Sequence, residues 1–449
     1  MSFNMLSRDM ALAWPRAAAF AARAVAGSLF SGGPERLLPP KRIERTPNQP
    51  TMALSIQAHE LMGRTKVSEL QALTPAMKQW RRQIHAHPET AFEERNTAAL
   101  VADVLAEAGL QTTTGFARTG VVGVLKNGDG PSLGLRADLD ALNLEERNDF
   151  QHRSRIPGKM HACGHDGHTA MLLGAARHLA RTKRFRGTVN FIFQPAEEND
   201  GGGRLMVDEG LFEKFPCDAI FGLHNWPGLE AGRFAIQAGP VMAAYDNFDV
   251  EICGQGSHAA MPHQGIDPVV IAAQIIMALQ TVVSRNDPLK PAVVSVTRVE
   301  AGFAYNVIPE KTTLRGTARS LFPETRDHIE NSVRRIVKGI CDSAGATASV
   351  TYRRSYPATI NSERETAFAQ QVVRATFGEE HLLTDYPPSM GSEDFAYMLE
   401  HKAGCYVKLG NGPGTGGCTL HNPRYDFNDE ILSAGAAYWV ALAEHYLPI

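Results

Sequence analysis

The stretch "KMHACGHDGHTAM" (residues 159–171) places a cysteine and several histidines ahead of small and apolar residues. Cys163 and His165 are two positions apart, and on an extended or turning backbone this spacing points both side chains the same way. Cysteine, histidine and carboxylate side chains together suit zinc, and they also accommodate manganese, cobalt or nickel. Taken alone, however, such a pair is more typical of a small buried residue and a helix cap.

Other polar side chains follow apolar stretches that have the length of strands. "VNFIF" runs into "QPAEE", which contains Glu197 and Glu198, and "AIFGL" runs into His224. Ligands of open α/β sheets bind at the carboxyl ends of the strands, so these groups are expected to converge with Cys163 and His165. These additional partners favour a metal site over a helix cap.

The paired carboxylates in "QPAEEN" suggest two different roles. Pro195 prevents a continuous helix, so Glu197 and Glu198 are expected on an irregular turn and facing different ways. One can bind metal while the other stays free as a general base. A Glu-Glu pair is usually solvated, but the apolar strand before this one argues against that reading. Asp138, at the end of "LGLRAD", is a further acid at a strand end.

The alternative chemistry for Cys163 is that of a catalytic nucleophile, with His165 or His168 as its base. Two nearby acids would raise the pKa of the thiol unless a cation compensates for them. A metal ion supplies that cation, and we therefore rank the nucleophile below the metal site.

The elements around these residues alternate between strand and helix patterns. Helical spacing covers 67–89, 96–110 and 168–182, and short apolar runs typical of buried strands cover 119–126, 131–138, 187–195, 218–226 and 404–410. The alternation predicts an α/β catalytic domain with a central mixed β-sheet flanked by helices.

The pattern changes near residue 242 and returns near 357. Between them the order is β-α-β-β-α-β, which predicts an inserted ferredoxin-like α+β lid domain. Its first helix has Asp267 as the expected N-cap and Pro268 in the first turn. The predicted organisation is an N-terminal extension outside the fold (1–60), a catalytic domain in two parts (61–241 and 357–449), and the lid (242–356).

Composition excludes several classes of protein. The chain has 449 residues, 43% hydrophobic residues and a net charge of −3, without a basic tract that would indicate nucleic-acid binding. No apolar run approaches the roughly 20 residues of a transmembrane helix. The six cysteines of the chain lack paired spacing, which favours a reducing compartment and a cytoplasmic location.

Some polar residues are weak signals by themselves. His421 lies in a Gly-rich region after the strand 404–410, and Asp394 in "MGSEDFAYML" is interpreted as a helix cap. His258 in "GSHAAMPH" and Asn306 in "NVIPE" look like ordinary loop polarity.

The ordered motifs together resemble the M20 metallopeptidase family. They are "MHACGHDGHTAMLLGAA", "QPAEE", "LHNWPG", "GSHAAMPH", "NVIPE", "MGSEDFAYML" and "LHNPRYDFND", and they extend over about residues 70–447. The chain is most similar to the amidohydrolase subfamily of hippurate hydrolases, N-acyl-amino-acid amidohydrolases and auxin–amino-acid conjugate hydrolases. Substitutions such as Asn143, Asn199 and Phe303, where other residues are common in the family, bear on specificity.

The resemblance implies two divalent metal ions (manganese, zinc, cobalt or nickel) and a role for each matched residue. The implied metal ligands are Cys163, His165, Glu198, His224 and His421, with Cys163 bridging the two ions. Glu197 matches the general base that accepts a proton from a water activated by the two metals, and Asp138 matches an aspartate behind the metals. His258, Asn306 and Arg319 match lid residues that bind substrate, and the lid histidine can reach a partner subunit.

The implied activity is cleavage of an N-acyl amino acid, including aroyl ones, into a carboxylic acid and a free amino acid. The expected partners are this small-molecule substrate and a second copy of the chain, as a homodimer or homotetramer through the lid, without nucleic acid or membrane. The alternatives are another M20 reaction (on carbamoyl or succinyl amino acids), a thiol enzyme using Cys163, and a non-catalytic binder that keeps the fold.

Overall fold

The computed structural model describes residues 67–198, 201–413 and 418–449. The predicted extension 1–60 therefore lies outside the described residues. In the described part, no helix is both long and apolar enough to cross a bilayer.

The larger part of the fold is an eight-stranded mixed sheet with the strand order β1-β2-β4-β3-β5-β16-β6-β15. Its strands are β1 (Gln111–Phe116), β2 (Gly120–Asn127), β3 (Ser132–Asp138), β4 (Gly187–Gln194), β5 (Ala219–Pro227), β6 (Phe234–Ala235), β15 (Leu382–Leu383) and β16 (Gly404–Gly412). The central strands β4, β3, β5 and β16 run parallel, so their carboxyl ends meet at one edge.

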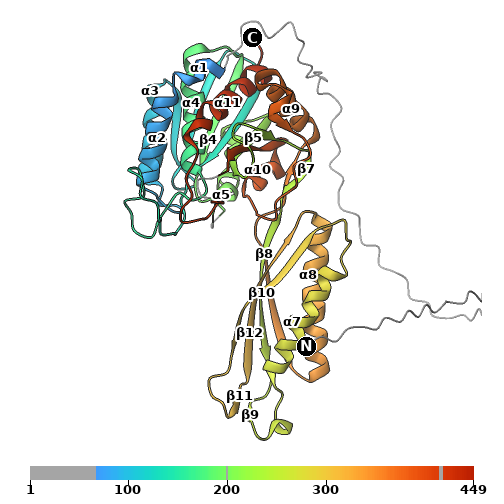
Figure 1. Cartoon of the computed structure of the whole chain (residues 1–449). Coiled ribbons are helices and arrows are strands. Elements are labelled where there is room, and N and C mark those ends of the chain that lie inside the picture. Colours follow the sequence, from blue (N-terminus) through green and yellow to red (C-terminus); the bar gives the residue numbers. More distant parts are fainter. Residues whose placement is uncertain (1–66, 199–200, 414–417) are drawn as a thin grey trace, which may run out of the picture. The chain divides into compact units, whose positions relative to one another are not determined.

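Helices cover both faces of this sheet, because successive side chains of each strand point to opposite sides. Phe191 and Phe221 pack into one core with α1 (Val67–Gln71), α2 (Thr74–Ala86), α3 (Arg95–Glu107), α4 (His165–Thr182), α9 (Glu363–Phe377) and α11 (Leu432–Tyr446). Their neighbours Ile192 and Ile220 belong to a second core with α5 (Gly202–Asp208), α6 (Leu211–Lys214) and α10 (Phe395–His401). The structure thus confirms the predicted mixed sheet between helices (Figure 1).

The inserted part forms an antiparallel four-stranded sheet with the order β10-β12-β8-β13. Its elements are β8 (Ala244–Cys253), α7 (Pro268–Ser284), β10 (Ala292–Ala301), β12 (Lys311–Ser320), α8 (Pro323–Ala344) and β13 (Thr347–Arg354). This order is the predicted ferredoxin-like one, and α7 and α8 pack on the sheet around Phe248 and Leu314. Asp267 caps α7 as expected, since its carboxylate accepts a hydrogen bond from the Val269 amide.

Short elements complete the fold. They are the pair β9 (Ser257–His258) and β11 (Val307–Ile308), the pair β7 (Gly239–Met242) and β14 (Thr359–Asn361), and the 3₁₀ turns η2 (Pro262–Gln264), η3 (Glu379–His381) and η5 (Asp429–Ile431).

Two predicted helices differ in their bounds. The segment expected as one helix over 67–89 is divided into α1 and α2, with Pro75 at the start of α2, because proline lacks the amide that would continue the first helix. Helix α4 begins at His165, earlier than the predicted 168, directly after Gly164, which has a left-handed φ of 97°. The edge strand β1 was not predicted, because "QTTTGF" is polar and exposed along most of its length.

Candidate metal centre

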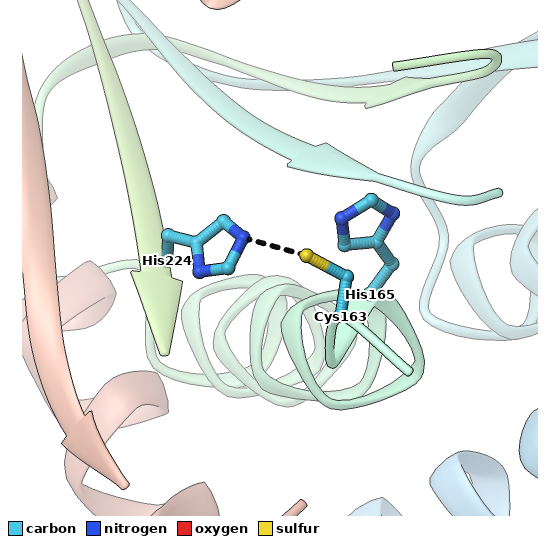
Figure 2. A group of neighbouring side chains, drawn as sticks. All are labelled: Cys163, His165 and His224. Carbon is cyan, nitrogen blue, oxygen red and sulfur yellow. Dashed lines mark hydrogen bonds between the residues drawn. The ribbon is translucent and has the colours of Figure 1, made fainter. Parts of the chain in front are cut away.

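The predicted metal ligands come together beyond the carboxyl ends of the parallel strands. His224 lies near the end of β5, Glu198 follows β4, and Cys163 and His165 stand at the beginning of α4. Figure 2 shows the Cys163 thiol pointing at the His224 ring, with His165 beside it. The Sγ atom of Cys163 is 3.3 Å from Nε2 of His224.

A second group shares Cys163 with the first. Ligand atoms of Cys163, His165 and His224 all lie within 4.8 Å of one another, and so do those of Cys163, Glu198 and His421. The Nε2 atom of His421 is 3.2 Å from Oε1 of Glu198. The five predicted ligands thus form two overlapping groups, with the Cys163 sulfur common to both.

His421 reaches this centre from a loop far along the chain. Its backbone has a φ of 63°, which is uncommon for a residue other than glycine. Its amide donates to the carbonyl of Ala162, next to Cys163, at 2.8 Å. The side chain is 53% exposed, in contrast to the other members of the centre, so His421 forms the solvent-facing side.

The imidazoles of His165 and His224 are oriented by acceptors on their other nitrogen. Nδ1 of His224 lies 2.6 Å from the backbone carbonyl of Asn225, and Nδ1 of His165 lies 2.8 Å from that of Asp140. A carbonyl only accepts, so each Nδ1 carries a hydrogen and each Nε2 is the nitrogen that faces the centre. This is the usual arrangement of histidines that bind metal.

Two buried atoms at the centre lack a hydrogen-bond partner among the described residues. They are Nε2 of His165 and Oε1 of Glu198, which lie 3.9 Å apart. Unpaired buried polar atoms are costly and rare. A cation between sulfur, nitrogen and carboxylate donors would satisfy both atoms, so the donor set fits a divalent metal.

The charges around Cys163 and His165 also favour the binding of a cation. Burial raises the pKa of the Cys163 thiol well above its usual value, and Glu198, Glu197 and Asp138 raise it further. Burial lowers the pKa of His165, but Asp138, Asp140 and Glu198 outweigh it and raise that pKa to about 10. Both residues therefore hold protons that a divalent ion would displace on binding.

Glu197 stands on a turn that is held from several sides. The amide of Ala196 donates to Glu94 Oε1 at 2.9 Å, and the amide of Glu198 donates to Asp140 Oδ2 at 3.0 Å. The hydroxyl of Tyr356 donates to the carbonyl of Glu197 at 2.6 Å. The Glu197 side chain lines the cavity, and burial raises its pKa well above the usual value, with Glu393, Glu198 and Asp394 adding to the effect.

Asp138 lies behind the centre and links it to a buried arginine. Its Oδ1 is 2.6 Å from Nδ1 of His168, and its Oδ2 accepts from Arg136 Nη1 at 2.8 Å. Burial raises the pKa of Asp138, but His165, His168 and Arg136 lower it well below its usual value. Asp138 thus carries a negative charge at neutral pH.

Arg136, Glu393 and Asp394 form a charged cluster that the sequence interpretation missed. The Arg136 guanidinium lies 2.9 Å from Glu393 and 3.1 Å from Asp394, and all three side chains are buried. Asp394 occupies the N-cap position of α10, as expected, but without a side-chain capping bond. Its carboxylate makes no cap to α10 and instead accepts from Gln194 and from the amide of Gly203. A possible signal was an arginine within the apolar strand "SLGLRAD".

The centre opens into a cavity of about 650 Å³. Apolar and aromatic side chains form much of its wall, from Trp226, Met242, Tyr245, Met390 and Leu420. Arg319 of β12 lines the cavity too, its Nη1 donating to the carbonyl of Met390 at 3.0 Å. The rest of the wall is polar, so the cavity offers both apolar surface and polar groups to a small molecule.

His258 and Asn306 do not line this cavity. His258 lies in β9, beyond the end of β8 at Cys253, whereas Tyr245 and Asn247 near the start of β8 do line it. Asn306 is a neighbour of His258, because its carbonyl accepts from the amide of Ala259 at 3.0 Å. Both residues are exposed. The structure brings these two lid residues together but apart from the centre.

The chain is similar to known proteins in both sequence and fold. Residues 134–445 match the model of Peptidase family M20/M25/M40. The chain is 41% identical over 383 residues to a hippurate hydrolase of Campylobacter jejuni (85% of this chain, 99% of the relative). It is 38% identical to an IAA-amino acid hydrolase of Arabidopsis thaliana (85% and 88%) and 37% identical to the N-acetyl-L-cysteine deacetylase of Bacillus subtilis (80% and 85%).

Among solved structures, the chain is similar to a putative aminohydrolase from methicillin-resistant Staphylococcus aureus. The TM-score is 0.81 at 30% identity, over 85% of this chain and 98% of the other. It is also similar to the YXEP protein of Bacillus subtilis, described as a dinuclear metal-binding peptidase from the M20 family. There the TM-score is 0.74 at 34% identity, over 84% and 99%. The family match and these relatives show that the chain is a member of the M20 peptidase family.

Proposed function

We propose that this protein is a metal-dependent amidohydrolase that cleaves N-acyl amino acids into a carboxylic acid and a free amino acid. The observation that carries the proposal is the convergence of five donor side chains beside the cavity that Glu197 lines, with two buried donor atoms that make no hydrogen bond among the described residues. The names of the relatives, which include a hippurate hydrolase and an N-acetyl-L-cysteine deacetylase, support an N-acyl amino acid as substrate.

We assign the binding of two divalent ions to Cys163, His165, Glu198, His224 and His421. Cys163 belongs to both donor groups and would contribute to the binding of either ion. When bound, such ions polarise a carbonyl group and lower the pKa of coordinated water. The description of YXEP as a dinuclear metal-binding peptidase supports two ions.

Glu197 is the proposed general base. Its carboxylate accepts a proton from the attacking water and delivers that proton to the amide nitrogen as the C–N bond breaks, so that water is divided between the two products. The turn that carries Glu197 is anchored by Glu94, Asp140 and Tyr356, which supports a fixed orientation of the carboxylate. Asp138 is proposed to stabilise the charge of the centre from behind, through His168 and Arg136.

The lining of the cavity supports separate binding surfaces for the acyl group and for the amino acid part of the substrate. Trp226, Met242 and Met390 offer an apolar surface for the acyl group. Arg319 offers a guanidinium, whose geometry suits the carboxylate of the amino acid. The guanidinium also lies 4.8 Å from the centre of the Tyr245 ring, which limits its freedom.

His258 and Asn306 are proposed to act in the cavity of a partner subunit, within a homodimer or homotetramer formed through the lid. Their exposure and their distance from the chain's own cavity support this proposal, as do the exposed Phe303 and Tyr305 beside them. Mixing a His258→Ala variant with a Glu197→Gln variant should restore part of the activity through hybrid oligomers. Absence of any recovery, with exchange of subunits shown by mass spectrometry, would reject this role.

The cysteines support the proposed cytoplasmic location. All six are free thiols in the structure, as expected for a reducing compartment.

The proposal is tested with a panel of substrates and metals. Benzoyl, acetyl, indole-acetyl and longer-chain N-acyl amino acids are assayed with manganese, cobalt, nickel or zinc, and release of the free amine is measured. Carbamoyl and succinyl amino acids serve as the comparison for other M20 reactions. Hydrolysis that persists after metal is removed, or that is restricted to the comparison substrates, would overturn the proposal.

A further inference from the structure

The hydroxyl of Tyr356 joins two points of the loop that carries Glu197. It donates to the carbonyl of Glu197 at 2.6 Å and accepts from the amide of Gly201 at 3.2 Å. These two residues lie on either side of residues 199–200. Tyr356 is 8% exposed, so water competes little for these hydrogen bonds. One buried oxygen atom therefore holds the loop at both Glu197 and Gly201.

Tyr356 belongs to the chain segment that leads from the lid back to the larger sheet. It follows β13, which ends at Arg354, and precedes β14, which begins at Thr359. Its carbonyl accepts from the amide of Tyr245, and the amide of Ser355 donates to the carbonyl of Tyr245, at 3.0 and 3.1 Å. The pairing of β13 with β8 thus continues up to Tyr356. Tyr356, whose side chain contacts the Glu197 loop, is therefore the last residue in this pairing.

The loop needs external support because its backbone is strained. Ala196, which precedes Glu197, has a φ of 55°, a left-handed conformation that residues with a side chain seldom adopt. Glu94 and Asp140 hold the amides of Ala196 and Glu198. The Tyr356 hydroxyl donates to the carbonyl of Glu197, which lies between these two amides in the chain. Loss of this bond would free the peptide after Glu197 to rotate and would loosen the backbone from which the Glu197 side chain extends.

We propose that Tyr356 is a positioning residue for the general base. Its hydroxyl fixes the Glu197 peptide so that the carboxylate faces the cavity, and it ties this loop to the strands that carry the lid. This inference rests on the proposed function, in which Glu197 transfers the proton.

The test compares Tyr356→Phe with the matched control Tyr397→Phe. The hydroxyl of Tyr397 donates to the carbonyl of Ser355 at 3.0 Å, so the control removes a similar bond one residue away, without a contact to Glu197. Each substitution deletes a single oxygen atom, and each variant is assayed well below its Tm. Steady-state kinetics, bound metal and hydrogen exchange of the metal-free protein are measured for both.

For Tyr356→Phe we expect kcat to fall about 5- to 50-fold, because a small misplacement of a reacting group has effects of this order. KM should stay within about twofold and the metal content should be unchanged, since the ligands remain. Amides of residues 196–198 and 201–203 should exchange faster in the metal-free variant. Tyr397→Phe should match the wild-type protein in all these measurements.

The proposal is overturned if Tyr356→Phe keeps its kcat, if its activity falls only in proportion to lost metal, or if Tyr397→Phe has the same effects. Hydrogen exchange separates this inference from the proposed function. If the protein cleaves none of the acylated substrates, faster exchange of the amides of residues 196–198 and 201–203 still supports the role of Tyr356 in holding the loop. Unchanged exchange refutes that role whatever the activity.

Discussion

His165 Nε2 and Glu198 Oε1 lie 3.9 Å apart, both buried, and neither is hydrogen-bonded within the described ranges. Nδ1 of His165 is held by the backbone carbonyl of Asp140, so Nε2 cannot turn away to find another partner. The amide of Glu198 is held by the Asp140 carboxylate. Asp140 therefore holds both the His165 ring and the Glu198 backbone beside the centre.

This relationship predicts that metal binding stabilises the folded protein. Addition of manganese, cobalt, nickel or zinc to chelator-treated protein should raise Tm and saturate at two ions per chain. A ligand that binds only the folded state stabilises it by about 4 kcal/mol at a thousandfold excess over Kd. Mass spectrometry of bound metal and thermal unfolding check this, with magnesium as a control ion. A Tm that is insensitive to both ions and chelator would reject the assignment.

Glu197→Gln should separate proton transfer from metal binding. Loss of a general base lowers kcat by about 10²-fold or more, whereas the amide side chain preserves the shape of the loop. Metal content should stay at the wild-type level. Glu198→Gln is the matched control on the adjacent residue, and it should lose bound metal instead. Near-wild-type turnover of Glu197→Gln with metal bound would show that another group carries the proton.

Cys163 distinguishes a metallohydrolase from a thiol enzyme. The pKa of its buried thiol is raised well above the usual value, first by burial and then by Glu198 and Glu197, so the metal-free protein should react slowly with iodoacetamide at pH 7. Phenanthroline should abolish the activity, and Cys163→Ser should lower the metal content. A thiol enzyme would show the reverse pattern, with rapid alkylation and resistance to chelators.

Metal binding should also release protons, because Cys163 and His165 hold them in the absence of a cation. The pKa of His165 is about 10 and that of Cys163 is higher than usual, so metal affinity should rise with pH between about 6 and 9. Titration calorimetry in buffers of different ionisation enthalpy measures the number of protons released. Affinity that is independent of pH would contradict the assigned ligands.

Arg136 should be essential to stability. Its guanidinium is buried among Asp138, Glu393 and Asp394, so Arg136→Met leaves several carboxylates without their cation. Breaking a buried ion pair from one side costs about 3–5 kcal/mol of unfolding free energy. Arg354→Met removes the exposed pairs with Asp327 and Glu330 and should cost less than about 1 kcal/mol. Urea unfolding of the two variants compares these values.

His85 should make stability dependent on pH in the alkaline range. Burial lowers its pKa, but hydrogen bonds and charges of Asp166 and Glu146 outweigh burial and raise the pKa to about 9. A raised pKa stabilises the folded state fully below the unfolded value near 6.5, and this contribution disappears as the pH rises through 9. A rise of the His85 pKa from 6.5 to about 9 corresponds to roughly 3 kcal/mol of unfolding free energy.

The measurement compares unfolding free energies of the wild type and His85→Gln at pH 6 and pH 9.5. The difference between them should shrink at the higher pH, because the wild-type histidine has lost its charge there. His401→Gln, at the exposed end of α10, serves as the control and should show no such trend. A difference that stays constant with pH would mean that His85 is neutral in the folded protein.

Much of the fold and of the candidate centre could be predicted from the sequence, because the relevant signals are local. The alternation of strands and helices, the β-α-β-β-α-β order of the lid and the Asp267 cap each depend on residues close together in the chain. The same holds for Cys163 and His165 within one motif and for Glu197 and Glu198 at one strand end. Which of these residues bind metal or substrate stays a prediction, and so do the exact domain boundaries.

The tertiary structure alone decided how distant residues meet. Arg136 and Asp394 are 258 positions apart, and they touch because β16 lies beside β5 and β5 beside β3 in the sheet. The tertiary structure also places the Tyr356 hydroxyl at the backbone carbonyl of Glu197. It keeps His258 away from the cavity that Arg319 lines. Periodicity and capping are properties of neighbouring residues, whereas these contacts depend on strand order and on where the lid is inserted. No local pattern carries that information, and so the partners of the buried Arg136 and of the Tyr356 hydroxyl became visible only in three dimensions.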